Sequence, residues 1–193
     1  TYDKVVDPQQ AMLSEASIDY KINKTALHAG RSQVNLDNQR FIGTVGWRQS
    51  ERSYDTLYAA DNSVENLNVL AAWVYGFAGV GGTTTTDTNS VLLHVDYKVM
   101  DELSVTAYDY MLANIHDTMG IALTGKVNAA GAKLDYRAEY ATQKDNTMKM
   151  HGAAANKVDA DYMNFDLGAN IAGILVGVNY EVLSGADGSG KTA

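Results

Sequence analysis

Arginine side chains are the most prominent candidates for binding a charged solute in this sequence. Four of them fall within one stretch of the sequence: Arg31, Arg40, Arg48 and Arg52. A guanidinium group binds a carboxylate through two parallel hydrogen bonds, so arginines at the narrowest part of a pore would select or guide anions. In a second interpretation, which is compatible with the first, the arginines pair with nearby acids and fix an inward-folded loop against a wall. The acids in question are Asp37, Glu51 and Asp55.

A second set of charges alternates in sign along one predicted strand. Lys133, Asp135, Arg137 and Glu139 occupy every second position, so strand geometry places them on one face. In the lumen of a channel, Lys133 and Arg137 would join the arginine cluster as solute-selecting cations. On a soluble barrel the same residues would form an ordinary solvated face, so this pattern does not distinguish the two kinds of barrel.

A hydrolytic site is the main enzymatic alternative. His94 has Asp96 two residues after it and Ser90 four residues before it, and all three share a polar face. A nucleophile, a base and an orienting group must lie within hydrogen-bond reach of one another. Because strand neighbours at i and i+2 lie about 6–7 Å apart, we expect no catalytic triad and no enzyme here.

A phosphate-binding loop is suggested by residues 185–192, which read GADGSGKT and match the pattern G-x-x-x-x-G-K-[ST]. Such a loop works between a buried strand and the start of a helix, whose backbone N–H groups hold the phosphates. The preceding segment ILVGVNYEVL is half polar, and only Ala193 follows Thr192. We therefore expect a glycine-rich turn and no bound nucleotide.

Metal ions, cofactors and nucleic acids have little support. Asp159 and Asp161, or Asp187, could bind Ca²⁺ loosely through oxygen ligands, but the sequence contains no complete ligand loop. The net charge of −8 disfavours a nucleic-acid partner. Without cysteine the chain has neither disulfides nor thiolate chemistry. We expect no metal and no cofactor.

The secondary structure that carries these residues is predicted from hydrophobic alternation. Apolar residues recur mainly at every second position, and a helical period is almost absent, so β-strands are expected. After Ser90, for example, Leu93 and Val95 share one face while His94 and Asp96 share the other, with Leu92 as an exception. A weaker stripe is predicted for Leu67, Val69, Ala71, Trp73, Tyr75 and Phe77. Strands are expected near residues 11–22, 25–34, 54–60, 67–77, 90–99, 103–112, 119–127, 132–143, 160–170 and 174–183.

The predicted connections alternate between short and long. Short turns are expected at residues 23–24, 61–66, 100–102, 128–131 and 172–173. Long connections are expected at residues 35–53, 78–89, 144–159 and after 184, with a shorter one near 113–118. Several strands reach the roughly 9–11 residues of a tilted membrane-spanning strand. Tight turns at one end and long loops at the other are typical of outer-membrane barrels.

Alternation alone leaves open which solvent surrounds the barrel. A soluble barrel that binds a small ligand would bury the apolar faces and expose the charged ones. A membrane barrel would turn the apolar faces to lipid and line its lumen with charges. Strand length and loop asymmetry favour the membrane. So does the placement of tyrosines near the ends of apolar stripes, where an interfacial girdle would lie: Tyr20, Tyr75, Tyr97, Tyr136 and Tyr180.

The stretch GRSQVNLDNQRFIGTVGWRQSERSYD is more specific than any periodicity. It resembles the alginate-export family of outer-membrane porins, in which Gly-Arg, an Asn/Asp-rich segment and Gly-Trp-Arg-Gln recur in this order. Arg31 matches the Gly-Arg motif and Arg48 the Gly-Trp-Arg-Gln motif. The resemblance implies a single-chain barrel of about eighteen strands, of which this chain would be a fragment. It also implies a passive diffusion pore, although the mixed lumen charges do not obviously attract a polyanion.

The sequence therefore predicts an all-β, transmembrane, antiparallel up-and-down β-barrel, with about ten strands forming an arc of a larger barrel. Residues 1–193 are expected to form one partial outer-membrane domain. We expect a porin for small or anionic solutes, with lipid bilayer and lipopolysaccharide as partners and residues 35–53 folded into the lumen. The solute-selecting candidates are Arg31, Arg40, Arg48, Arg52, Lys133 and Arg137.

Overall fold

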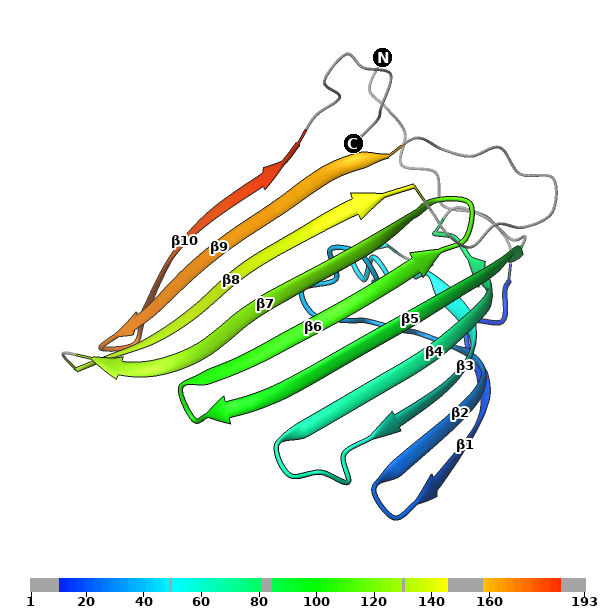
Figure 1. Cartoon of the computed structure of the whole chain (residues 1–193), viewed down its shortest axis with the longest axis horizontal. Coiled ribbons are helices and arrows are strands. Elements are labelled where there is room, and N and C mark those ends of the chain that lie inside the picture. Colours follow the sequence, from blue (N-terminus) through cyan, green and yellow to red (C-terminus); the bar gives the residue numbers. More distant parts are fainter. Residues whose placement is uncertain (1–10, 49, 81–84, 130, 146–157, 185–193) are drawn as a thin grey trace.

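A computed structural model describes residues 11–48, 50–80, 85–129, 131–145 and 158–184 of the chain. In this part the chain forms one antiparallel sheet of ten strands, each paired with its neighbours in sequence (Figure 1). None of the described residues forms a helix that is long and apolar enough to cross a membrane. The strands are β1 (Ala16–Ile22), β2 (Thr25–Ser32), β3 (Ser53–Asp61), β4 (Leu67–Ala78), β5 (Thr85–Met100), β6 (Leu103–Leu112), β7 (His116–Ala129), β8 (Ala132–Lys144), β9 (Asp159–Ile171) and β10 (Ile174–Leu183).

All ten predicted strands are present, and the short turns close one end of the sheet as expected (Figure 1). The tightest turns use left-handed backbone, with φ of 53° at Asn23, 51° at Ala172 and 88° at Gly173. Such turns match the twist of paired strands. The main differences are that β1 begins at Ala16 rather than near residue 11 and that β5 begins at Thr85 rather than near residue 90. Threonine favours extended backbone, and Thr85 and Thr86 pair with the end of β4.

The sheet has an inner face, against which residues 35–53 pack, and an outer face. Apolar side chains on the outer face are exposed, including Ile121 at 50%, Leu167 at 54% and Val178 at 68% of their surface. The alternating positions of the inner face carry polar and charged residues, as the sequence predicted. A soluble barrel would have its apolar face inside, so the structure has the membrane-barrel arrangement of the two faces.

Leu92 and Phe77 show how the structure departs from simple alternation for physical reasons. Leu92 lies on the inner face and is completely buried, because the inward loop covers it. Phe77 was expected to face outward, and this expectation is wrong. A bulge between Val74 and Gly76 shifts the strand by one residue, so that Phe77 opposes Tyr54 and packs against the inner cluster.

Residues 35–53 cross the concave side of the sheet, behind β5 and β6 in Figure 1. Ile42 is 4% exposed and joins the buried cluster, while Phe41 packs against the rings of Tyr108 in β6 and Tyr162 in β9. Local bonds shape the loop itself: the Leu36 N–H donates to the Ile42 carbonyl at 3.1 Å. The predicted inward fold of this loop is confirmed.

Gly30 is expected to tolerate no side chain. Its φ is 133°, and a Cβ atom would lie 2.3 Å from the carbonyl oxygen of Ala16 in the neighbouring strand β1. Gly30→Ala should therefore destabilise the β1–β2 pair by more than about 1 kcal/mol. The measurement is the free energy of unfolding of the full-length protein in detergent. Gly173→Ala serves as the control, since its left-handed turn has open space at the Cβ position; an equal loss in both variants would contradict the steric argument.

Candidate functional site

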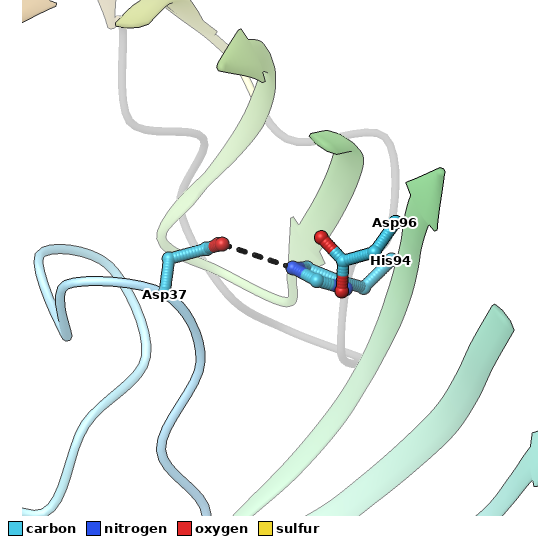
Figure 2. A group of neighbouring side chains, drawn as sticks. All are labelled: Asp37, His94 and Asp96. Carbon is cyan, nitrogen blue, oxygen red and sulfur yellow. Dashed lines mark hydrogen bonds and ion pairs between the residues drawn. The ribbon is translucent and has the colours of Figure 1, made fainter. Parts of the chain in front are cut away.

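The centre of the candidate site is Asp37 of the inward loop, whose carboxylate contacts the wall. Its backbone adopts a left-handed conformation with φ of 50°. Its Oδ1 accepts a hydrogen bond from His94 Nε2 at 3.1 Å (Figure 2). Its Oδ2 accepts one from the Tyr110 hydroxyl at 3.2 Å. Arg137 Nη2 lies 4.0 Å from Oδ1. Three strands thus hold one loop carboxylate.

His94 is placed between two carboxylates. Its Nε2 faces Asp37, and its Nδ1 lies 3.4 Å from Asp96 Oδ2 (Figure 2). Nε2 is the donor toward Asp37, because carboxylates only accept hydrogen bonds, while Nδ1 makes a longer ion-pair contact with Asp96. The backbone spacing of residues i and i+2 was expected to prevent a direct triad hydrogen bond, and the structure shows none between His94 and Asp96; their side chains nevertheless approach to 3.4 Å as an ion pair.

A catalytic triad does not form around His94. The Ser90 hydroxyl bonds instead with Thr88 Oγ1 at 2.7 Å and accepts from the Ala113 N–H at 2.9 Å. Both nitrogens of the His94 ring face carboxylates rather than a hydroxyl. The arrangement can fix the loop in place but offers no nucleophile–base pair.

Asp37, His94 and Asp96 also form the one group in the described part of the chain that is close enough to hold a metal ion, with ligand atoms within 4.8 Å of one another. The guanidinium of Arg137 beside Asp37 opposes cation binding there. We therefore interpret the group as an ion-pair network. Of the carboxylates considered for Ca²⁺, Asp159 pairs with Lys144 and Asp161 accepts from Tyr140 at 2.8 Å; Asp187 lies outside the described residues.

Arg137 connects the loop to a buried acid. Glu139 is 3% exposed, and its Oε2 accepts from Arg137 Nε at 2.9 Å while its Oε1 accepts from the Tyr108 hydroxyl at 2.7 Å. The Arg137 guanidinium therefore lies between Glu139 and Asp37. One cation compensates two carboxylates, one from the wall and one from the loop.

Arg40 extends the loop toward the far strands. Its guanidinium lies 5.4 Å from the ring centre of Tyr162, and its Nε is 3.6 Å from Glu181 Oε1 on β10. Phe41 meets the same Tyr162 ring edge-on at 5.3 Å between centroids. The loop is thus held at both β5–β8 and β9–β10, so it spans most of the inner face.

The other predicted residues lie elsewhere. Arg31 is on the outer face, contrary to its expected lumen position, and forms a bidentate pair with Asp55 at 2.7 Å. Arg48 lies over the Trp47 ring, and Arg52 over the Phe77 ring. Lys133 is exposed on the inner face near the short turns, away from the loop. Arg40, Arg48 and Arg52 belong to the docked loop itself, and Arg137 of β8 is the predicted wall residue that contacts it, through Asp37.

Asp37, Tyr108 and Tyr110 were missed as site residues. Sequence reasoning treated Asp37 only as a pairing partner for arginines, and it treated the tyrosines of segment 103–112 as part of a strand. A usable signal was present, since Tyr108 and Tyr110 stand two residues apart and must share a face. Their stacked rings, 4.7 Å apart, form the floor under the loop.

Asp37 should hold the loop down to acidic pH. Burial alone would raise the pKa of Asp37, but the hydrogen bond from His94 and the charges of His94 and Arg137 outweigh it, so that this pKa lies below its ordinary value of about 3.9. A lowered pKa means that the stabilisation is complete above the ordinary pKa and is lost only as the pH falls through the folded pKa.

The expected result is steady single-channel current on acidification from pH 7 and increased current noise only below about pH 4. The groups facing Asp37 are His94 and Asp96 of β5, Tyr110 of β6 and Arg137 of β8. Asp37→Asn is the control and should show no such acid transition. A transition near pH 5–6 in the wild type would show that another group controls the loop.

Comparisons with solved structures identify the fold. OccAB3 of Acinetobacter baumannii aligns with a TM-score of 0.74 at 17% identity, covering 91% of this chain and 47% of that chain. OccK2 (OpdF) of Pseudomonas aeruginosa, solved in complex with glucuronate, aligns at 0.72 and 13%, covering 91% and 50%. OpdL of P. aeruginosa aligns at 0.71 and 16%, covering 92% and 51%.

These proteins are outer-membrane porins, and the chain spans about half the length of the solved structures that it matches. No known family model and no curated protein sequence matches the chain. The resemblance to the alginate-export family therefore stays a prediction. The predicted arc of a larger barrel agrees with the coverage of about half of each matched structure. The chain has the porin β-barrel fold.

Proposed function

We propose that this chain is part of an outer-membrane barrel that acts as a passive diffusion channel for small organic anions. The observation that carries the proposal is the loop 35–53, which is fixed across the polar inner face of a porin-fold sheet. A loop held inside a barrel narrows the lumen and brings chosen side chains to the path of the solute. The arginines of this region, Arg40 and Arg137, supply positive charge there.

Two neighbours support an anionic solute class. OccK2 was solved in complex with glucuronate and OpdK of P. aeruginosa with vanillate, and both compounds are carboxylates. The inner face of this chain also carries acids, among them Asp135 and Asp166, so its charge is mixed. A small anion can contact the lumen cations one after another, so a mixed lining of this kind suits small anions better than a long polyanion such as alginate.

The outer face would contact the bilayer and, in its outer leaflet, lipopolysaccharide. Aromatic side chains with polar tips are exposed there: Tyr75 at 38%, Tyr97 at 47% and Tyr180 at 61%. Trp73 is 43% exposed, and its Nε1 donates to Asn89 at 2.8 Å. Rings of this kind favour membrane–water interfaces. In lipid the unpaired edges of β1 and β10 would require partner strands, which a larger closed barrel provides.

The test is single-channel recording of the full-length protein, purified in detergent and inserted into a planar bilayer under a salt gradient. Discrete conductance steps with an anion-selective reversal potential are expected. Addition of benzoate or glucuronate should interrupt the current, whereas a neutral sugar should not. If the folded protein gave no conductance steps, the channel proposal would be refuted. Cation-selective steps would refute the anionic solute class but would still support a pore.

A further inference from the structure

A small cavity lies between the inward loop and the wall, on the side of the long loops. Its volume is about 160 Å³. The loop contributes Phe41 and Ile42, and the wall contributes Tyr54, Phe77 and Leu112 among other residues. Apolar cavities of about this size admit a single six-membered ring, as an engineered cavity of roughly 150 Å³ admits benzene.

A cation without an acid faces this mainly apolar cavity. Arg52 lines it, and its Nε is buried and has no hydrogen-bond partner. Its guanidinium lies 5.7 Å from the centroid of the Phe77 ring, and it forms no ion pair within the described part of the chain. Arg31 and Arg137, by contrast, each hold a carboxylate directly. Arg52 as a whole is partly exposed, so its guanidinium is only partly desolvated, and an anion beside it would supply the counter-charge that it lacks.

Two hydroxyl groups complete the lining. Thr88 Oγ1 and Ser90 Oγ share a hydrogen bond of 2.7 Å, and Ser90 Oγ also accepts from the Ala113 N–H. When Ser90 donates to Thr88, the Thr88 hydrogen is free to donate to a guest. The cavity therefore combines aromatic and aliphatic walls, one unpaired guanidinium and one available hydroxyl donor.

We propose that this cavity binds a compact organic monocarboxylate of about the size of benzoate, with its carboxylate on Arg52 and its ring between Phe41 and Phe77. The inference goes beyond the proposed channel, because the cavity lies behind the loop rather than along the inner surface that a passing solute would touch. A guest in contact with both loop and wall stabilises the docked loop by mass action.

Calorimetric titration of the full-length protein in detergent tests this proposal with three probes. Benzoate carries the ring and the charge, benzamide the ring without the charge, and acetate the charge without the ring. Benzoate should bind at least about tenfold more tightly than either of the others, which corresponds to about 1.4 kcal/mol. Equal binding of benzamide, or no binding of benzoate, would overturn the proposal.

Matched variants locate the site. Arg52→Gln should weaken benzoate binding at least about tenfold, whereas Arg48→Gln, in the same loop but outside the cavity wall, should leave it unchanged. Leu112→Phe retains every charge and fills the cavity, so it should also abolish binding. If benzoate binds Arg52→Gln and Leu112→Phe as it binds the wild type, the cavity is not the site. Conductance is measured separately, so failure of the channel and failure of this site are distinguishable.

Discussion

Ile42→Asp is expected to release the inward loop and to raise the single-channel conductance of the full-length protein well above that of the wild type. Ile42 is 4% exposed and packs in the cluster that contains Leu92, which is fully buried. Truncating such a side chain costs about 2–5 kcal/mol. A carboxylate at the same place adds the cost of burying an unpaired charge, which is larger still.

The loop has other attachments, but they do not compensate for this loss. Each hydrogen bond to the charged Asp37 contributes about 1.5–3 kcal/mol, and these bonds remain only while the loop stays close to the wall. Once Ile42 is expelled, the carboxylate of Asp37 moves away from His94 and Tyr110 together with it. The apolar anchor therefore decides whether the loop is docked, and the polar contacts fix where it docks.

Trp47→Asp is the matched control for Ile42→Asp, since it places the same charge in the same loop at a side chain that is 75% exposed. Its conductance should equal that of the wild type. Both variants must migrate as folded barrels on a detergent gel before recording. Unchanged conductance of a folded Ile42→Asp protein would contradict the inference that this loop forms the constriction.

Arg137→Met is expected to have the second largest effect, on both stability and selectivity. It leaves Glu139, which is 3% exposed, without its cation and removes the positive charge beside Asp37. Removing one partner of a buried ion pair costs about 3–5 kcal/mol. The lumen near the loop also becomes more negative, so the reversal potential should shift toward cation selectivity.

A double variant separates the two effects of Arg137→Met. Combining it with Glu139→Leu removes the stranded charge and should restore most of the free energy of unfolding, measured by urea titration in detergent. Lys133→Met is the control on the same strand and face; because Lys133 is exposed, it should change stability by less than about 1 kcal/mol. If Arg137→Met proved no more destabilising than Lys133→Met, the bridging role of Arg137 would be refuted.

Hydrophobic alternation was sufficient to predict the ten strands, the two faces and the end at which the turns are short. The error at Arg31 came from the same rule applied incompletely. Leu27 and Ala29 already define the outer face of β2, and Arg31 follows them at the same period. Its partner Asp55 was correctly among the acids considered, but the pair joins β2 to β3 on the outer face instead of anchoring the loop.

Other features depend on contacts that no local pattern contains. The prediction that Phe77 faces outward was wrong because of a bulge in β4. A single bulged residue exchanges the inward and outward directions of the side chains that follow it. The docking of Phe41 depends on Tyr108 and Tyr162, which belong to strands far along the sequence. Backbone spacing excluded only a direct triad hydrogen bond between His94 and Asp96, and it does not predict the approach of their side chains to 3.4 Å. The phosphate-loop segment, residues 185–192, lies outside the described residues.

The long reach of the inward loop has a consequence for the order of assembly. The loop connects β2 to β3, yet Phe41 rests on Tyr162 of β9. Closing contacts of such sequence separation is slow and comes late. The lumen should therefore stay open while the strands pair with one another, and the inward loop should dock only after β9 has joined the sheet. Substitutions at Phe41 should then accelerate unfolding and leave the folding rate nearly unchanged.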